Sequence, residues 1–333
     1  MKDLHSLSVF GAGSYGTALA IAVASKGYNV TLWGRNADSI KAMSLSRTNE
    51  RYLPGITFPK DLKLTASLEE CVKASSNLLI VVPSNTFAAV LESIVPFLTK
   101  DHRLAWATKG IEGKNGELLS TVARRLVPKS MPLAALSGPT FAKELALGMP
   151  TAIAVAGTDP QFSSELCEIM HTPTFRIYES SDFIGLQLGG TVKNVIAIGA
   201  GLSDGLGFGA NARTALITRG LAEMIRLGVA MGATERGFMG MSGLGDLILT
   251  CTDNQSRNRR FGYMLGQGVS VKDALDKIAQ VVEGYVMIPE VYKLAQKYNV
   301  QMPICSQLYE VICKGKPAKV AAKELLGRSL KSE

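Results

Sequence analysis

The chain has 333 residues, of which 47% are hydrophobic and 19% charged. This composition excludes a disordered chain, and the length predicts about two domains. The net charge of +8 comes from 36 basic residues scattered among 28 acidic ones. The basic residues are not interleaved with aromatic side chains, so we expect no nucleic-acid partner and favour ligands that carry phosphate.

The most apolar stretch, residues 183–210, contains Lys193, Asp204 and several glycines. A membrane span needs about 20 mostly apolar residues, so we interpret this stretch as a buried helix and loop. At the N-terminus, Asp3 and the glycines from Gly11 onward interrupt the apolar core of a signal peptide. We therefore expect a cytoplasmic protein without membrane insertion.

The five cysteines are an odd number, and no two of them stand in a CxxC motif. This usage predicts neither a disulfide framework nor a zinc site. A reducing compartment fits it best, and we expect no metal.

Short apolar runs alternate with helix-like segments in the first half of the chain. The predicted strands are residues 7–10, 30–33, 78–82, 104–107, 133–136 and 152–155. Predicted helices between them include residues 16–26 and 85–98. Most of the runs lack polar alternation, which is typical of strands buried on both faces of a parallel sheet. The pattern predicts an α/β layer fold.

Beyond about residue 180 the strand-like runs cease. Predicted helices cover residues 182–201, 211–228, 271–280 and 289–298, and Pro303 opens a further segment. We therefore predict an α/β domain over residues 1–181 and an all-helical domain over residues 182–333.

A GxGxxG motif follows the first predicted strand and opens the first predicted helix. Its glycines are Gly11, Gly13 and Gly16. They permit a tight turn and a close backbone approach, while the helix N-terminus offers N–H groups to a pyrophosphate. The alternative is a turn that serves helix packing alone, but the strand and helix around it favour a dinucleotide site.

The second predicted strand ends in Trp33-Gly34-Arg35-Asn36. NAD-specific folds usually have an acidic residue here, roughly 20 residues past the glycines. Arg35 instead can pair with a 2′-phosphate and stack on adenine, which favours NADP(H) over NAD(H). Alternatively, Arg35 is a solvated loop residue.

Two polar loops follow neighbouring predicted strands. Lys109 follows the strand at 104–107, and Ser137-Gly138-Pro139-Thr140 follows the next one. Ligands of open α/β sheets bind at the carboxyl ends of strands, so we expect both loops to face the cofactor. Lys109 as a simple surface cation is the alternative.

In the helical half, Lys193 and Asn194 interrupt an otherwise apolar helix. A lysine there is costly unless it is paired or used. Asp246 is a candidate partner, and its spacing to Thr250 puts both on one face of a helix. Alternatively, Asp246 is an ordinary acid at a helix N-terminus, since Ser242 and the glycines after it resemble a helix start.

Ser256-Arg257-Asn258-Arg259-Arg260 combines guanidinium groups with small hydrogen-bonding neighbours. This combination suits a phosphate monoester. A solvated basic loop is the alternative.

Taken together, these motifs resemble the bacterial biosynthetic NAD(P)-dependent glycerol-3-phosphate dehydrogenases. The resemblance covers nearly the whole chain, through GAGSYGTALA, LWGR, ATKG, LSGPTFAKE, GTVKNVIAIGAG, GLGDLILTCT, SRNRRFG and QVVEGY. It implies a Rossmann-like domain, a helical domain like the C-terminal domain of 6-phosphogluconate dehydrogenase, and a homodimer. It also implies reversible reduction of dihydroxyacetone phosphate to sn-glycerol 3-phosphate for phospholipid synthesis.

The resemblance further implies roles for particular residues, with Lys193 as the catalytic acid/base. The dinucleotide would contact Ser14, Tyr15, Arg35, Ala142, Val281 and Glu283. The substrate would contact Lys109, Gly138, Thr140, Asp246, Ser256, Arg257 and Asn258. Of these, Lys109 and Arg257 would touch both ligands.

Two other functions remain open. One is a related two-domain NADP-dependent dehydrogenase that acts on a hydroxy acid, because SRNRR suits a carboxylate as well as a phosphate. The other is a non-catalytic NADP-binding sensor. A lysine buried beside an aspartate disfavours the sensor, which has no use for a charge in its core.

Overall fold

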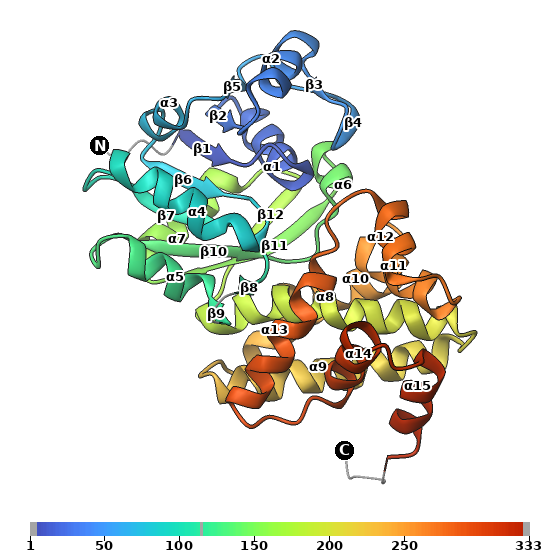
Figure 1. Cartoon of the computed structure of the whole chain (residues 1–333). Helices are drawn as coiled ribbons and strands as arrows, with labels where there is room; N and C mark the ends of the chain where they lie inside the picture. The colour runs from blue at the N-terminus through green and yellow to red at the C-terminus, as the bar shows by residue number, and fades with distance from the viewer. Residues whose placement is uncertain (1–4, 114–115, 329–333) are drawn as a thin grey trace. The chain divides into compact units, whose positions relative to one another are not determined.

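The computed structural model describes residues 5–113 and 116–328 (Figure 1). The chain divides into two compact units. The first holds the described residues up to Glu112 and those from Glu117 to Gln187, and the second holds those from Leu188 onward with Gly113 and Gly116. Every strand among the described residues lies in the first unit, and the second is helical. The predicted combination of an α/β and an all-helical part is confirmed.

The described part of the first unit is built on one sheet of eight strands. In spatial order these are β12 (Phe175–Glu179), β11 (Thr151–Gly157), β10 (Leu133–Ser137), β7 (Arg103–Trp106), β6 (Asn77–Ile80), β1 (Ser6–Phe10), β2 (Asn29–Trp33) and β5 (Lys63–Thr65). The central strands are parallel, with Leu104, Leu78, Ser8 and Thr31 in register across them. Their carboxyl ends therefore meet at one edge of the sheet.

Helices cover both faces of this sheet (Figure 1). The helices α1 (Ser14–Ala24), α6 (Ala142–Ala146) and α7 (Pro160–Met170) contribute buried side chains to one apolar core with the sheet. On the other face, Phe87 of α4 (Ser84–Ile94) meets the ring of Trp106 edge-on at 5.7 Å. Burial on both faces explains the uninterrupted apolar runs of the central strands.

The prediction of a parallel sheet is wrong for one pair, because β10 and β11 are antiparallel. The connection between them carries only the five-residue helix α6. A parallel crossover usually carries a helix that runs back along the strands, and α6 is too short to do so. The connection does not return the chain to the other end of the sheet, so β11 starts beside the end of β10.

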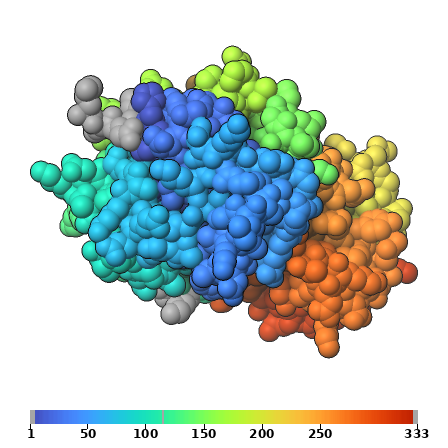
Figure 2. All heavy atoms as spheres, turned by 90° about the horizontal axis from the view of Figure 1, so that it is seen from above, coloured from blue at the N-terminus to red at the C-terminus, as the bar shows by residue number. Residues whose placement is uncertain are grey.

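Neither edge strand of the sheet was predicted from the sequence. The strand β5 has only three residues, and β12 carries exposed residues such as Arg176 and Tyr178. A pair of short strands, β3 (Thr48–Asn49) and β4 (Leu53–Thr57), also lies outside the main sheet. Its segment, with the preceding α2 (Ala37–Ser46), reaches the surface of the first unit (Figure 2).

The second unit is organised around α8 (Phe183–Gly205), whose first residues belong to the first unit. By length and composition α8 could cross a membrane, but 89% of its most apolar window is buried inside the protein. This burial is what we predicted for the stretch. The helices that follow are α9 (Ala210–Ala230), α10 (Asp246–Thr252), α11 (Arg257–Gly266), α12 (Val271–Ile278), α13 (Glu283–Lys297), α14 (Pro303–Lys314) and α15 (Ala318–Leu326).

One predicted helix start is wrong. The sequence placed it at Pro289, but α13 begins at Glu283 and contains the proline. Gly284 and Val286 are weak helix formers, so local propensity favoured a start at the proline. Tertiary contacts override it, since the N–H of Gly284 donates to Asn258 Oδ1 at 2.8 Å. Pro303, in contrast, opens α14 as predicted.

Candidate active site

The glycine loop between β1 and α1 is shaped by two different constraints. Gly11 has a φ of +127°, and a Cβ there would lie 2.1 Å from the carbonyl oxygen of Val81. A Cβ on Gly13 would meet no protein atom within 4 Å. The fold therefore requires glycine at position 11, whereas at position 13 a glycine is useful to a ligand that approaches the backbone.

The N-terminus of α1 is suited to an anion. Gly13 is its N-cap, no side chain caps the first turn, and that turn contains no acidic residue. The first N–H groups of a helix lack partners within the helix and carry partial positive charge. Together with the open space at Gly13, this geometry fits the pyrophosphate of a dinucleotide.

Arg35 is exposed in the loop between β2 and α2. The N–H of Gly11 donates to the carbonyl of Trp33 at 3.0 Å, so the end of β2 adjoins the glycine loop. Gly34 also lies close to this loop, since a Cβ built on it would be 3.1 Å from Ala12 Cβ. The arginine thus stands at the edge of the proposed dinucleotide site.

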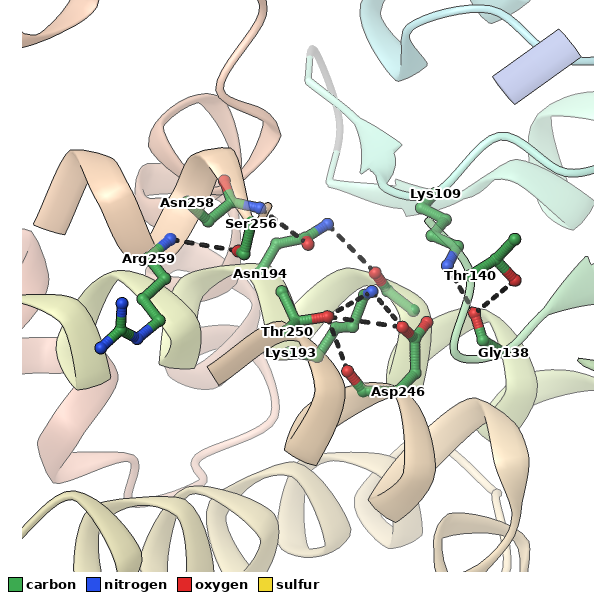
Figure 3. A network of polar contacts seen from close by, with 11 residues as sticks. Lys109, Gly138, Thr140, Lys193, Asn194, Asp246, Thr250, Ser256, Asn258 and Arg259 are labelled. Carbon is green, nitrogen blue, oxygen red and sulfur yellow. Dashed lines mark hydrogen bonds and ion pairs between the residues drawn. The ribbon is translucent and has the colours of Figure 1, made fainter. Parts of the chain in front are cut away.

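Lys109 links the loops that follow β7 and β10 (Figure 3). Its Nζ donates to the carbonyl of Gly138 at 3.1 Å and lies 5.8 Å from the centroid of the Tyr15 ring. Thr140 Oγ1 donates to the same carbonyl at 3.3 Å, and Ala142 opens α6, which packs on α1. The predicted residues of the first unit therefore gather at the carboxyl ends of the strands.

In the second unit, Lys193 of α8 forms an ion pair with Asp246 of α10. The Lys193 ammonium also donates to Thr250 Oγ1 at 2.8 Å, one turn further along α10 (Figure 3). Lys193 is only 6% exposed and Asp246 is fully buried. The pairing expected from the sequence is present, and it fixes the direction of a charged donor within an apolar helix.

The backbone around Asp246 explains how α10 approaches α8. The residues before it form η3 (Met241–Gly245), a single π-helical turn, where the sequence suggested an ordinary helix start. A Cβ on Gly189 of α8 would lie 2.3 Å from the carbonyl oxygen of Ser242. Only glycine permits this contact, which lies one turn before Lys193 and brings Asp246 within reach of it.

Ser256, Arg257 and Asn258 lie at the start of α11. Ser256 is its N-cap and accepts a hydrogen bond from the N–H of Arg259 at 3.2 Å. Asn258 Nδ2 donates to Asn194 Oδ1 at 2.9 Å, and Asn258 Oδ1 accepts from the N–H of Gly284. Asn258 thus ties α11 to α8 and α13. Sequence reasoning noted Asn194 as a polar residue in an apolar helix but did not assign it to the site.

Arg257 and Glu283 open α11 and α13, and each affects the titration of the other. Burial raises the pKa of the Glu283 carboxyl from its usual 4.5 to about 7, and Arg257 opposes this rise. Burial likewise lowers the pKa of Arg257, while Glu283 opposes that fall. Val281, assigned to the dinucleotide, is exposed just before α13.

Two arginines at the start of α11, Arg257 and Arg259, differ in their contacts. Arg259 pairs with Asp204 at 2.6 Å and also donates to Asn254. Asp204 accepts a second pair from Arg213 of α9 at 2.9 Å. Arg259 therefore braces the start of α11, which leaves Arg257 as the candidate ligand-binding arginine of the two.

The fold and these residues define the class of protein. A Rossmann-type sheet has a glycine loop that leads into a helix without a side-chain cap, and a helical unit follows that holds a buried lysine–aspartate pair. This is the arrangement of an NAD(P)-dependent oxidoreductase.

Comparisons with known proteins identify the family. Residues 6–163 match the model of the NAD-dependent glycerol-3-phosphate dehydrogenase N-terminus, and residues 182–323 match that of the C-terminus. The chain belongs to the NAD-dependent glycerol-3-phosphate dehydrogenase family.

Individual relatives agree with this assignment. Glycerol-3-phosphate dehydrogenase (NAD(P)+) of Photobacterium profundum is 61% identical over 334 residues, covering 100% of this chain and 99% of that protein. The enzyme of Shewanella pealeana is 59% identical, with 100% and 98% covered. The crystal structure of glycerol-3-phosphate dehydrogenase from Coxiella burnetii aligns with a TM-score of 0.94 at 44% identity, covering 97% of this chain and 99% of that one.

Proposed function

We propose that this chain reversibly reduces dihydroxyacetone phosphate to sn-glycerol 3-phosphate with NADPH or NADH, and so supplies glycerophospholipid synthesis. Membership of the family and the names of its close relatives support this reaction. Among the structural observations, the buried Lys193 carries the proposal. Burying the charged ammonium of an α8 side chain costs free energy, and the reduction of a ketone requires a proton donor of this kind.

The chemistry of Lys193 follows from its contacts. A bound reduced nicotinamide supplies hydride to the carbonyl carbon of the substrate. Lys193 stabilises the negative charge that develops on the carbonyl oxygen and donates a proton to it. Asp246 and Thr250 hold Nζ in one direction during this transfer. In the reverse reaction, the neutral amine accepts the proton of the substrate hydroxyl.

The substrate phosphate is assigned to the start of α11. Arg257 offers a guanidinium with a geometry that matches phosphate oxygens, and the helix N-terminus adds partial positive charge. Ser256 and Asn258 are proposed as further residues that contact the substrate phosphate. Lys109, Gly138 and Thr140 are proposed as further substrate contacts, with Lys109 and Arg257 also touching the dinucleotide.

The dinucleotide is assigned to the glycine loop. The backbone at Gly11, Gly13 and Gly16 holds the pyrophosphate, with Ser14 and Tyr15 beside it. Arg35 pairs with the 2′-phosphate, which makes NADPH the preferred cofactor. Further contacts are proposed for Ala142, Val281 and Glu283.

A direct assay separates this function from the two alternatives. Nicotinamide absorbance is followed with purified protein, NADPH or NADH, and either dihydroxyacetone phosphate or unphosphorylated dihydroxyacetone. We expect oxidation only with the phosphorylated ketone, and faster with NADPH. Oxidation with a 2-keto acid instead would identify a hydroxy-acid dehydrogenase, and NADPH binding without any turnover would identify a sensor.

We further propose that residues 1–181 are the dinucleotide-binding domain and residues 182–333 the substrate and catalytic domain. The protein is proposed to act in the cytoplasm as a homodimer without membrane insertion. Light scattering coupled to size-exclusion chromatography measures the oligomeric state, and a mass of one chain would contradict the dimer.

A further inference from the structure

The ribbon formed by β3 and β4 interrupts the alternation of strands and helices between α2 and β5 (Figure 1). Arg47, which precedes β3, has a φ of +57° and joins the start of the ribbon to the segment that follows β4. Its guanidinium donates to the carbonyls of Pro59, of Lys60 at 3.1 Å and of Leu62 at 3.0 Å. These three hydrogen bonds tie the two ends of the ribbon together.

Asn49 is the last residue of β3, and its side chain is buried. It is only 2% exposed. Its Nδ2 donates to the carbonyl of Ala12 at 3.1 Å and to Thr17 Oγ1 at 2.9 Å. Ala12 lies between the first two glycines of the loop, and Thr17 lies in α1 directly after the last one. One amide therefore ties the glycine loop to the first turn of the helix.

The orientation of this amide is determined by chemistry. A backbone carbonyl only accepts hydrogen bonds, so the NH2 group of Asn49 must face Ala12. An aspartate would place a carboxylate oxygen against that carbonyl and repel it. Serine and alanine would leave the carbonyl of Ala12 without this donor.

We propose that Asn49 is a positioning residue for dinucleotide binding, which clamps the glycine loop in the conformation that directs the first N–H groups of α1 at the pyrophosphate. The proposal rests on the proposed function of that loop. Without the clamp, binding must order the loop as well as make its contacts, and affinity falls accordingly. The proton chemistry at Lys193 does not depend on it.

The test compares Asn49→Ala and Asn49→Asp with the wild type. Loss of one buried hydrogen-bond donor predicts a rise of roughly tenfold in the KM and Kd for NADPH, with kcat changed by less than about twofold. The Kd is measured by NADPH fluorescence and the KM with saturating dihydroxyacetone phosphate. Thr17→Val, which removes only one of the two acceptors, is expected to give a smaller rise in Kd.

Two controls make the outcome decisive. Val122→Ala lowers stability in α5 (Leu119–Leu126), outside the apolar core that holds α1, and should leave the Kd for NADPH unchanged. Gly13→Val fills the open space in the loop and should abolish NADPH binding. Wild-type NADPH affinity in the Asn49 and Thr17 variants, with binding lost in Gly13→Val, would overturn the role of Asn49 alone. Wild-type affinity in Gly13→Val would instead overturn the assignment of the loop to the dinucleotide.

Discussion

At the scale of single residues, the pair of Lys193 and Asp246 places two charged groups in the buried interior of the second unit. Moving two charges out of water costs several kcal/mol per ion, and their attraction offsets this cost only with good geometry and further hydrogen bonds. Thr250 supplies one such bond, at 2.8 Å from Lys193 Nζ. A pair of this kind is retained for function more readily than for stability.

The substitution Asp246→Asn removes the negative charge of this side chain and keeps its shape. We expect Asp246→Asn to lower kcat by roughly 100-fold or more, because the lysine loses the group that orients it for proton transfer. Steady-state oxidation of NADPH by dihydroxyacetone phosphate measures this. A kcat within threefold of wild type would show that Asp246 is dispensable for orientation.

The stability of the ligand-free protein depends on pH through Glu283. Because the pKa of the Glu283 carboxyl is raised from 4.5 to about 7 in the folded protein, the folded state binds the proton more tightly than the unfolded one. The resulting stability is fully present below about pH 4.5 and is lost as the pH rises to about 7. The Glu283→Gln variant does not lose this stability as the pH rises, because its amide does not titrate. The melting temperatures of the ligand-free wild type and Glu283→Gln variant should therefore diverge between pH 5 and pH 7. Parallel curves would show that the pKa of Glu283 is not raised.

At the scale of secondary-structure elements, α14 shows a cap supplied from another helix. No side chain of its own caps its N-terminus. The Glu223 carboxylate of α9 instead accepts hydrogen bonds from the N–H groups of Ile304 at 2.6 Å and Cys305 at 3.2 Å. Burial raises the pKa of this carboxyl, although the hydrogen bonds oppose the rise.

Glu223→Ala leaves two buried N–H groups without their acceptor, which should lower the free energy of unfolding by roughly 1–3 kcal/mol. Urea denaturation measures the loss. Glu235→Ala serves as the control, because Glu235 is exposed. Equal stability of both variants would show that α14 does not depend on Glu223.

Elements with local signals were predictable from the sequence, and those set by distant contacts were not. The central strands and the glycine loop are encoded by contiguous residues, as is the pairing face of Asp246 and Thr250. The edge strands lack an apolar run, and the start of α13 depends on Asn258. Asn49 gave no signal within its polar segment, because its partners lie 37 and 32 residues away.

At the scale of the whole molecule, the proposed site residues are divided between the two units. The glycine loop, Arg35 and Lys109 belong to the first, whereas Lys193, Asp246 and Arg257 belong to the second. The end of the strand-like runs near residue 180 predicted that an α/β part of the chain is followed by a helical part, and the secondary structure confirms this order. The pyrophosphate contacts that we propose lie in the first unit, whereas the proton donor that we propose lies in the second.

The most direct test of this account is a comparison of turnover and cofactor binding in Lys193→Ala. We predict that NADPH-dependent reduction of dihydroxyacetone phosphate falls by about 1,000-fold or more, because the proton donor is gone. The Kd for NADPH, measured by fluorescence on the same preparation, should stay within about twofold of wild type, since each tenfold change requires 1.4 kcal/mol of lost contact. Turnover near the wild-type rate would contradict the assignment of Lys193 as the catalytic acid.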